Sequence, residues 1–493
     1  MADEDTEGQE PKVMNRWMIV LGAILIQLAL GAIYAWSAFT TPLQGTPAKG
    51  TTPAVLSEFA FNKTQTQAIF SAGLATFAIF TIIGGRLREK WGSRNVAMLG
   101  GVILGLGYII GSFVGANFAL KLVSIGIIAG AGIGLAYVVP IAVGVKWFPD
   151  KKGLVTGLAV AGFGFGSFIW ILLANPPSIL HINGLITKQT GAAAYTIANV
   201  DRCFMIYGII LMVFVILGSL VMKNPPDGWK PKGWNPPAPK ADDKKKIIKS
   251  LLPKKMVKTM QFWLLWMMFI IGALAGLMVI GNVQNFAKST DGFPGHGFSA
   301  TEAADFAVIG AAVCLPILNG IGRITWGMIS DKIGRKKALI SMFIFQGVTL
   351  AIFFFTVSNP YAFFIVAALI GFNFGGNFAL FPAATADSFG NETVGINYGF
   401  VFTAYGIGGI VGPLLAGYVQ DAGMSFMYAF IPAAVMCFVA AAIAAAYKPQ
   451  VEIKEEKESA TVEDTETEQA GGDKTEEDAK NAGEEGADEE DEK

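Results

Sequence analysis

The segment Gly85-Arg-Leu-Arg-Glu-Lys-Trp-Gly-Ser-Arg94 returns 242 positions later as Gly327-Met-Ile-Ser-Asp-Lys-Ile-Gly-Arg-Lys336. The same offset, without a gap, also pairs glycines and a proline in two further regions of the chain. These pairs are Gly134 with Gly376, Pro140 with Pro382, Gly157 with Gly399, Gly164 with Gly406, and Gly166 with Gly408. A chance match would not keep one register through three separate regions. The chain therefore consists of two related halves, each with one copy of the repeated segment.

Both halves consist largely of long apolar runs. Of the 493 residues, 53% are hydrophobic and 15% are charged, whereas soluble domains carry about 25% charged residues. A bilayer core about 30 Å thick needs roughly 20 apolar residues per helix. Twelve spans are predicted, near residues 17–39, 66–86, 95–115, 118–145, 153–175, 203–222, 261–287, 303–328, 337–357, 360–384, 394–417 and 424–447. We therefore expect an all-α polytopic membrane protein of two six-helix repeats, an architecture of transporters with the substrate site at the repeat interface.

Positive charges gather in loops on one side of the predicted bundle. Lys and Arg follow the second, fourth and eighth spans, and such loops are retained on the cytoplasmic side of a membrane. The first ten residues are acidic, which is the wrong charge for a secretory signal peptide, so the first run is expected to stay as a helix. We therefore expect a multi-pass protein of the cell (plasma or inner) membrane with both termini cytoplasmic.

The charges also divide the chain into segments. We expect a cytoplasmic N-terminus (1–16), a six-helix bundle (17–222), a Lys/Pro-rich cytoplasmic linker (223–260), a second six-helix bundle (261–447) and an acidic cytoplasmic tail (448–493). The linker holds eleven lysines, which suits contact with anionic lipid headgroups. The tail has 19 acidic and 6 basic residues and few large apolar ones, so we expect it to be disordered.

The sequence lacks the patterns of classical catalysis. It has no nucleotide-binding glycine loop, no histidine–glutamate metal cluster and no nucleophile with a neighbouring base in a span. The cysteines Cys203, Cys314 and Cys437 lie in apolar runs without metal or redox spacing. We therefore expect no enzyme activity, no cofactor, no metal and no nucleic-acid partner.

One charge lies well inside a predicted span. A charged side chain in a bilayer costs at least a few kcal/mol and so tends to mark a pathway. Outside the acidic tail only Arg323 is so placed, whereas Lys121 and Arg202 lie at span ends, where long side chains can reach the interface. Arg323 either binds an anion such as a carboxylate through two parallel hydrogen bonds, or extends to the cytoplasm and fixes the next loop. Asn319, one turn earlier, either assists Arg323 or clasps another helix.

Several other polar side chains lie near the middle of spans that would face a central cavity. Tyrosine hydroxyls and amides on an otherwise apolar wall suit a small hydroxylated or carboxylated solute. Each is also compatible with packing between helices. The candidates are Tyr34, Tyr137, Asn373, Asn377 and Tyr405.

The repeated segments resemble the signature that follows helices 2 and 8 of the major facilitator superfamily. Within that superfamily, the chain resembles the oxalate/formate antiporter family, which is related to the monocarboxylate transporters. The supporting segments are Gly31-Ala-Ile-Tyr-Ala-Trp-Ser37, Trp147-Phe-Pro-Asp-Lys-Lys-Gly-Leu-Val-Thr-Gly157 and Asn319-Gly-Ile-Gly-Arg323. The resemblance covers about residues 15–447 and implies the major facilitator fold, with two halves that tilt around a central site. It also implies a gating motif made of Gly85, Glu89, Arg94, Gly327, Asp331 and Lys336.

The resemblance implies roles for individual residues. In the family, the arginine of helix 8 binds the substrate carboxylate, and Arg323 matches it. Oxalate-exchanging members carry a lysine in helix 11 where this chain has Tyr405, and one fixed cation suits a monoanion better than a dianion. Monocarboxylate transporters often carry an aspartate where this chain has Asn319. The resemblance therefore does not imply a proton relay through this position. Tyr34 and Tyr137 would orient the substrate, and Phe402 with its aromatic neighbours would close the cavity.

The expected function is secondary active transport of a small organic anion, a monocarboxylate such as lactate, pyruvate or formate. The expected partners are the carboxylate, a proton (symport) or counter-anion (antiport), and membrane lipids, and the expected working form is a monomer. Two alternatives are an oxalate/formate-type dicarboxylate exchanger and a membrane sensor or scaffold that does not transport. A sugar carrier would not need Arg323, and a carrier of cationic drugs would need a buried acid.

Overall fold

The computed structural model is helical and confirms the twelve predicted spans. It describes residues 14–44, 58–150, 152–186, 196–226, 229–231, 233, 251–390 and 393–448. Within these residues, 12 helices are long and apolar enough to cross a membrane. The chain divides into the units Met1–Gln450 and Val451–Lys493, and the fold described below is that of the first. The acidic tail after residue 448 and the linker stretch 234–250 lie outside the described residues.

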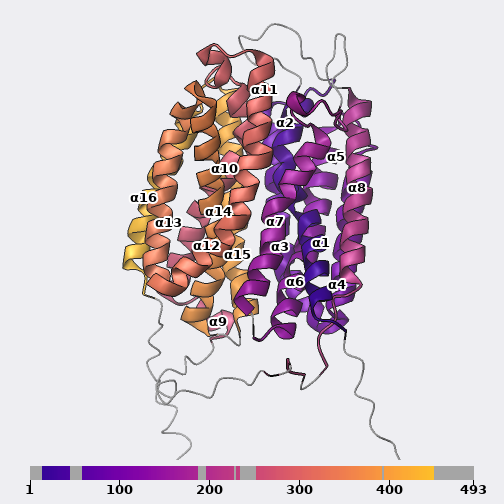
Figure 1. Cartoon of the computed structure of the whole chain (residues 1–493), viewed down its shortest axis with the longest axis vertical. Coiled ribbons are helices and arrows are strands. Elements are labelled where there is room, and N and C mark those ends of the chain that lie inside the picture. Colours follow the sequence, from indigo (N-terminus) through magenta and orange to yellow (C-terminus); the bar gives the residue numbers. More distant parts are fainter. Residues whose placement is uncertain are drawn as a thin grey trace, which may run out of the picture. The chain divides into compact units, whose positions relative to one another are not determined.

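Each half of the chain contributes six spans. The first six consist of α1 (Trp17–Leu30) with η1 (Gly31–Trp36) and α2 (Ser37–Leu43), α3 (Lys63–Trp91), α4 (Ser93–Gly111), α5 (Phe118–Lys121) with η2 (Leu122–Ile128) and α6 (Ala129–Trp147), α7 (Lys152–Ala174), and α8 (Ile197–Ser219). The last six consist of α10 (Met260–Lys288), α11 (Ala300–Ile309) with η6 (Gly310–Cys314) and α12 (Leu315–Ile333), α13 (Arg335–Phe353) with η7 (Phe354–Ser358), α14 (Pro360–Phe389), α15 (Val394–Asp421), and α16 (Met427–Ala446). Short connecting elements are η3 (Ser178–Leu180), α9 (Pro253–Met256) and η5 (Phe293–His296). The two sets of helices lie side by side (Figure 1).

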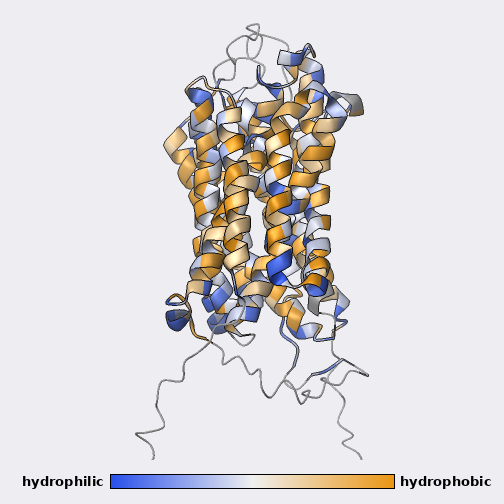
Figure 2. Ribbon diagram, turned by 90° about the vertical axis from the view of Figure 1, so that its left-hand side faces the viewer, coloured by the Kyte–Doolittle hydropathy of each residue, from blue (hydrophilic) through white to orange (hydrophobic). Residues whose placement is uncertain are grey.

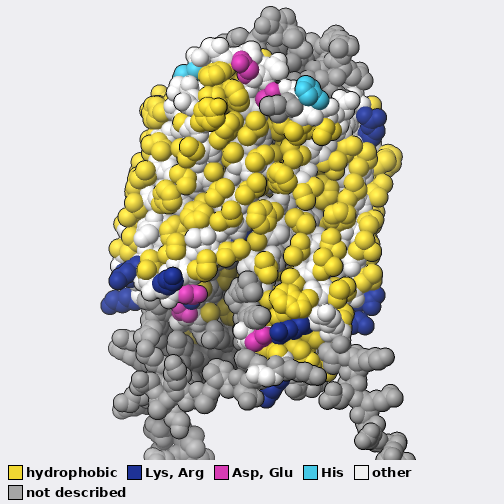
Figure 3. Space-filling model, viewed as in Figure 1, with side chains coloured by type: hydrophobic (Ala, Val, Ile, Leu, Met, Phe, Trp, Pro, Cys, Tyr) yellow, Lys and Arg dark blue, Asp and Glu magenta, His cyan; other side chains and the backbone are white. Residues whose placement is uncertain are grey.

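The surface of the bundle has the polarity of a membrane protein. Apolar residues line the middle of the helices, and hydrophilic residues gather mainly near the helix ends (Figure 2). On the face drawn in Figure 3, apolar side chains cover the middle, while Lys, Arg, Asp, Glu and His lie towards the two ends. Apolar side chains can remain exposed over this height because lipid tails, rather than water, would cover them.

The repeated segments make the same turn in both halves. α3 is followed by Gly92 with φ 80°, and α12 is followed by Gly334 with φ 86°. Positive φ is strained for residues with a Cβ, so both points favour glycine. The next helix begins at once, α4 at Ser93 and α13 at Arg335. We call the end of the bundle that holds these two turns the motif end, and the other the opposite end.

Helices α3 and α15 form a seam between the halves, and their packing differs along its length. Towards the opposite end, a Cβ on Gly406 would lie 2.8 Å from the Cβ of Ala78, and a Cβ on Gly409 would lie 2.7 Å from that of Leu74. Near the motif end, a Cβ on Gly395 would meet no described atom within 4 Å. The seam is therefore tight towards the opposite end and looser towards the motif end, where a Cβ on Gly399 would lie 3.5 Å from Ile82 and Gly395 is exposed.

Polar contacts also join the halves at the opposite end. The carboxylate of Asp421, which ends α15, accepts hydrogen bonds from the backbone N–H groups of Lys63 (3.0 Å) and Thr64 (2.7 Å), where α3 begins. Helix N-termini favour negative charge, so one half caps a helix of the other. Asp305 on α11 likewise accepts from the backbone N–H of Ser178 (2.7 Å) at the start of η3. These contacts join the two halves at the opposite end.

A matched pair of substitutions on α15 tests the difference along the seam. Gly409→Leu forces a side chain into the tight part, where overpacking costs about 1–3 kcal/mol. Gly395→Leu places the same side chain in open space on the same helix. We expect the melting temperature of the purified protein to fall for Gly409→Leu and to stay unchanged for Gly395→Leu. Equal falls for the two variants would contradict a seam that is tight at one end and looser at the other.

Candidate functional site

Arg323 lies in the middle of α12 and is buried, with 3% of its surface exposed. Its Nε donates a hydrogen bond to Asn319 Oδ1 (3.1 Å), and its Nη1 donates to the backbone oxygen of Val160 on α7 (3.0 Å). The first bond lies within α12, and the second joins the two halves. Among the described residues, Nη2 has no hydrogen-bond partner. Part of the guanidinium is therefore fixed by the protein, and one nitrogen remains free to bind.

Two glycines allow α7 and α12 to approach closely enough for this contact. A Cβ on Gly164 would lie 3.1 Å from the backbone nitrogen of Gly320 and 3.3 Å from Arg323 Nε. A Cβ on Gly320 would lie 2.6 Å from the ring of Phe165. Small residues let two helices pack closely in a membrane. The glycine at position 164, which recurs in the second half of the sequence, therefore helps to position Arg323.

Aromatic rings surround the guanidinium. Its Cζ lies 4.0 Å from the ring centre of Phe378 on α14 and 5.7 Å from that of Phe163 on α7. A cation over an aromatic face is attracted by the quadrupole of the ring. In the part of the chain that the structure describes, the four ion pairs involve other cations, and no carboxylate pairs with Arg323. Neutral groups alone therefore hold this charge.

A second buried cation provides a contrast. Lys121 was expected at a span end, within reach of the interface, but its side chain is fully buried and pairs with Asp201 on α8. Its Nζ also donates to the backbone oxygen of Gly111 (2.8 Å) and lies 5.0 Å from the ring centre of Phe204. A buried cation with an anion and hydrogen bonds is satisfied within the protein. Arg323 differs because no described carboxylate pairs with it.

Four of the other predicted residues lie beside Arg323. The hydroxyls of Tyr34 on η1 and Tyr405 on α15 are 3.0 Å apart and join the halves. Tyr137 on α6 stacks on Phe402 of α15, with ring centres 5.6 Å apart. All three tyrosines share a ring neighbour with the guanidinium, because Phe163 contacts Tyr34 and Tyr137, and Phe378 contacts Tyr405 (ring centres 5.6 Å apart). We define the arginine site as Arg323, Asn319, Tyr34, Tyr137, Phe402 and Tyr405.

Two phenylalanines that the sequence analysis did not single out hold these rings in place. Phe163 contacts Tyr34 (ring centres 5.0 Å apart) and Tyr137 (5.6 Å). Phe77 on α3 contacts Tyr137 (5.0 Å) and Phe402 (5.3 Å). One phenylalanine in an apolar run carries no signal of its own, although glycines flank Phe163 on both sides, as is common where membrane helices pack closely.

An amide predicted for the cavity lies on another face of α14. The Nδ2 of Asn377 donates to the backbone oxygen of Phe374 (3.1 Å), and its Oδ1 packs against Gly272 on α10. These contacts place Asn377 beside α10, and the next residue, Phe378, covers Arg323 instead. Asn373, one turn earlier on α14, is buried, and its amide atoms have no partner within the described ranges.

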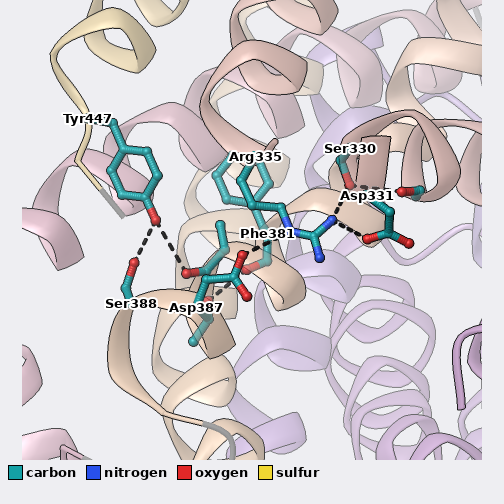
Figure 4. Close-up of polar contacts among 10 residues, drawn as sticks. Ser330, Asp331, Arg335, Phe381, Asp387, Ser388 and Tyr447 are labelled. Carbon is teal, nitrogen blue, oxygen red and sulfur yellow. Dashed lines mark hydrogen bonds and ion pairs between the residues drawn. The ribbon is translucent and has the colours of Figure 1, made fainter. Parts of the chain in front are cut away.

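The repeated segment of the second half forms a polar network at the motif end (Figure 4). Arg335 donates hydrogen bonds to Asp331 (2.6 Å), to Asp387 on α14 (3.0 Å) and to the hydroxyl of Ser330. These bonds tie α12, α13 and α14 together. The cation that pairs with Asp331 is thus Arg335, the neighbour of the predicted motif residue Lys336.

The remaining motif residues lie at the same end of the bundle. Glu89 is near the end of α3, and Arg94 is at the start of α4. A Cβ on Gly85 would meet none of the described atoms within 4 Å, and a Cβ on Gly327 would meet only that of Ala379, at 3.8 Å. Close packing therefore requires neither glycine in this structure.

Known proteins of similar sequence include carriers of small carboxylates. The oxalate:formate antiporter of Oxalobacter formigenes is 29% identical over 442 residues, which are 89% of this chain and 92% of the relative. The apicoplast pyruvate carrier 1 of Toxoplasma gondii is 25% identical over 464 residues, covering 81% of this chain and 83% of the relative. Human monocarboxylate transporter 14 is 22% identical over 498 aligned positions, covering 84% of this chain and 86% of the relative.

The sequence model of the Major Facilitator Superfamily matches residues 35–319 and 295–471, which is well over half of the chain. This match agrees with the twelve spans and with the two copies of the repeated segment. The chain therefore belongs to the Major Facilitator Superfamily and is a membrane transporter, not an enzyme, related to the oxalate:formate antiporter and the monocarboxylate transporters.

Proposed function

We propose that this transporter carries small monocarboxylates, such as lactate, pyruvate or formate, across the cell membrane by alternating access. The observation that carries the proposal is the free Nη2 of the buried Arg323 in the described structure. A buried guanidinium without a counter-ion is costly, and a carboxylate offers it a negative charge and two acceptor oxygens. The names of two relatives, which include formate and pyruvate, support the same substrate class.

A count of charges favours a monoanion. Arg323 supplies one positive charge, and Tyr405 stands where oxalate-exchanging members carry a lysine. The hydroxyl of Tyr405 bonds to Tyr34 and brings no charge of its own. A second negative charge on the substrate would remain uncompensated among buried aromatic rings. Dicarboxylate exchange is the second candidate, favoured by the 29% identity with the oxalate:formate antiporter.

The transport cycle rests on movement of the two halves around the arginine site. Because the seam is looser towards the motif end, a carboxylate would enter from that side. We assign the motif end, and with it both termini, to the cytoplasm because Lys and Arg gather in its loops. Release on the other side requires the caps of Asp421 and Asp305 to break and the motif end to close, where Gly85 and Gly395 leave room. One chain holds the complete site, so a monomer suffices, with energy supplied by a proton or a counter-anion.

Replacing Arg323 with glutamine tests its binding role. Truncating one partner of a buried charge pair costs about 2–5 kcal/mol, so we expect kcat/KM for labelled lactate or formate in proteoliposomes to fall roughly 30-fold or more. The melting temperature should not fall, because Arg323→Gln removes a buried charge that has no described counter-ion. As a control, Arg202→Gln removes an arginine whose bond to Asn199 lies away from the site and should leave uptake unchanged. Unchanged uptake in Arg323→Gln, or a lost uptake that follows a lower melting temperature, would contradict the binding role.

The charge count is tested at Tyr405. Tyr405→Lys adds a second cation to the arginine site, so we expect the ratio of oxalate to lactate uptake to rise well above that of the wild type. Tyr405→Phe removes the bond to Tyr34 without adding charge and should leave this ratio unchanged. If the two variants show the same ratio, charge does not select the substrate at this position.

The same preparations separate transport from sensing. A transporter exchanges labelled for unlabelled lactate or formate across the vesicle membrane. Binding of these acids in a thermal-shift assay, without any counterflow, would instead favour a membrane sensor that keeps the fold.

A further inference from the structure

Tyr398 on α15 has a buried hydroxyl for which the arginine site as defined gives no role. Its hydroxyl oxygen is buried and has no hydrogen-bond partner among the described residues, although the residue as a whole is half-buried. A buried hydroxyl left unpaired costs free energy, so such a group calls for a physical explanation. The sequence analysis did not select Tyr398 as a candidate.

Helix geometry places Tyr398 on the face of α15 that lines the arginine site. Residues four and seven positions apart share one face of an α-helix, so Tyr398, Phe402 and Tyr405 form a line of rings. The ring centres of Tyr398 and Phe402 are 5.6 Å apart, and those of Phe402 and Tyr405 are 4.8 Å apart. Tyr398 is the member of this line nearest the motif end, where the seam is looser. A solute that enters from the motif end would therefore meet Tyr398 before Tyr405.

Ring contacts connect Tyr398 to the guanidinium. Tyr398 contacts Phe402, the ring of Phe402 lies 6.4 Å from that of Phe378, and the ring centre of Phe378 lies 4.0 Å from Arg323 Cζ. Arg323 Nη2 and Asn319 Nδ2 are also buried, and the described structure gives them no partner. All three free groups are hydrogen-bond donors, and a carboxylate accepts about four hydrogen bonds. A single carboxylate would satisfy the three donors and neutralise the arginine.

We propose that Tyr398 is a substrate-positioning residue, whose hydroxyl donates a hydrogen bond to one carboxylate oxygen while Arg323 Nη2 and Asn319 Nδ2 bind the other. This inference rests on the proposed function, because it requires a carboxylate substrate. α12 and α15 both belong to the second half, so the carboxylate would stay with that half when the two halves tilt. Tyr398 and Tyr405 then differ in role, since the hydroxyl of Tyr405 is already bonded to Tyr34.

Uptake of labelled formate and lactate by the full chain in proteoliposomes tests this inference. Tyr398→Phe removes the hydroxyl and keeps the ring that packs on Phe402. We expect KM for both acids to rise roughly tenfold or more, as for the loss of one hydrogen bond to a charged group, with little change in maximal rate. Tyr405→Phe should raise KM less. Tyr418→Phe, on the same helix but 62% exposed, should behave as the wild type.

The outcomes separate this inference from the proposed function. Normal wild-type uptake with an unchanged KM in Tyr398→Phe would overturn the inference and leave the function standing. A lower maximal rate at unchanged KM would assign Tyr398 to the movement of the halves, and it would also overturn the inference. If the wild type neither transports formate or lactate nor binds them in a thermal-shift assay, the proposed function fails, and the inference fails with it.

Discussion

A guanidinium buried among neutral groups, without a described carboxylate partner, is the constraint on which the rest of the structure depends. Burying an isolated charge is costly, and neither the hydrogen bond to Asn319 nor the ring of Phe378 cancels the charge of Arg323. The same chain also contains a buried cation that the protein itself neutralises, because Lys121 is buried together with Asp201. The packing of α12 therefore fixes the position of Arg323 while leaving its charge available to an anion.

Arg323 also links the site to the arrangement of the two halves. Its Nη1 binds Val160 on α7, and Tyr405 binds Tyr34, so two contacts of the site cross from one half to the other. These contacts must change when the halves tilt. A ligand shifts such an equilibrium only if its affinity differs between the two arrangements. A carboxylate that replaces neutral contacts of Arg323 provides such a difference in affinity. This difference has to exceed the free energy of contacts that must break, one of which is the cap formed by Asp421 at the opposite end.

The sequence was sufficient to predict the spans, the repeat and the buried charge, but not the faces that the helices turn toward one another. Span length and the 242-residue offset are properties of the chain itself, and Arg323 was conspicuous as a charge in an apolar run. Asn377 was expected at the cavity, yet Phe378 covers the guanidinium. Neighbouring residues on a helix point about 100° apart, and a span that is apolar all round has no periodicity that marks its inner face. Phe163 and Tyr398 were missed for this reason, because only tertiary packing determines which ring meets Arg323.

The central claim is that a substrate carboxylate neutralises Arg323, and a competition experiment with charged and neutral ligands of equal shape tests it most directly. Labelled lactate or formate is bound to the purified full chain and displaced with the unlabelled acid or with its amide, lactamide or formamide. The account predicts displacement by the acid and none by the amide at the same concentration, because the amide cannot neutralise a guanidinium. Equal displacement by the amide would contradict the account, since shape and hydrogen bonding, rather than charge, would then govern binding.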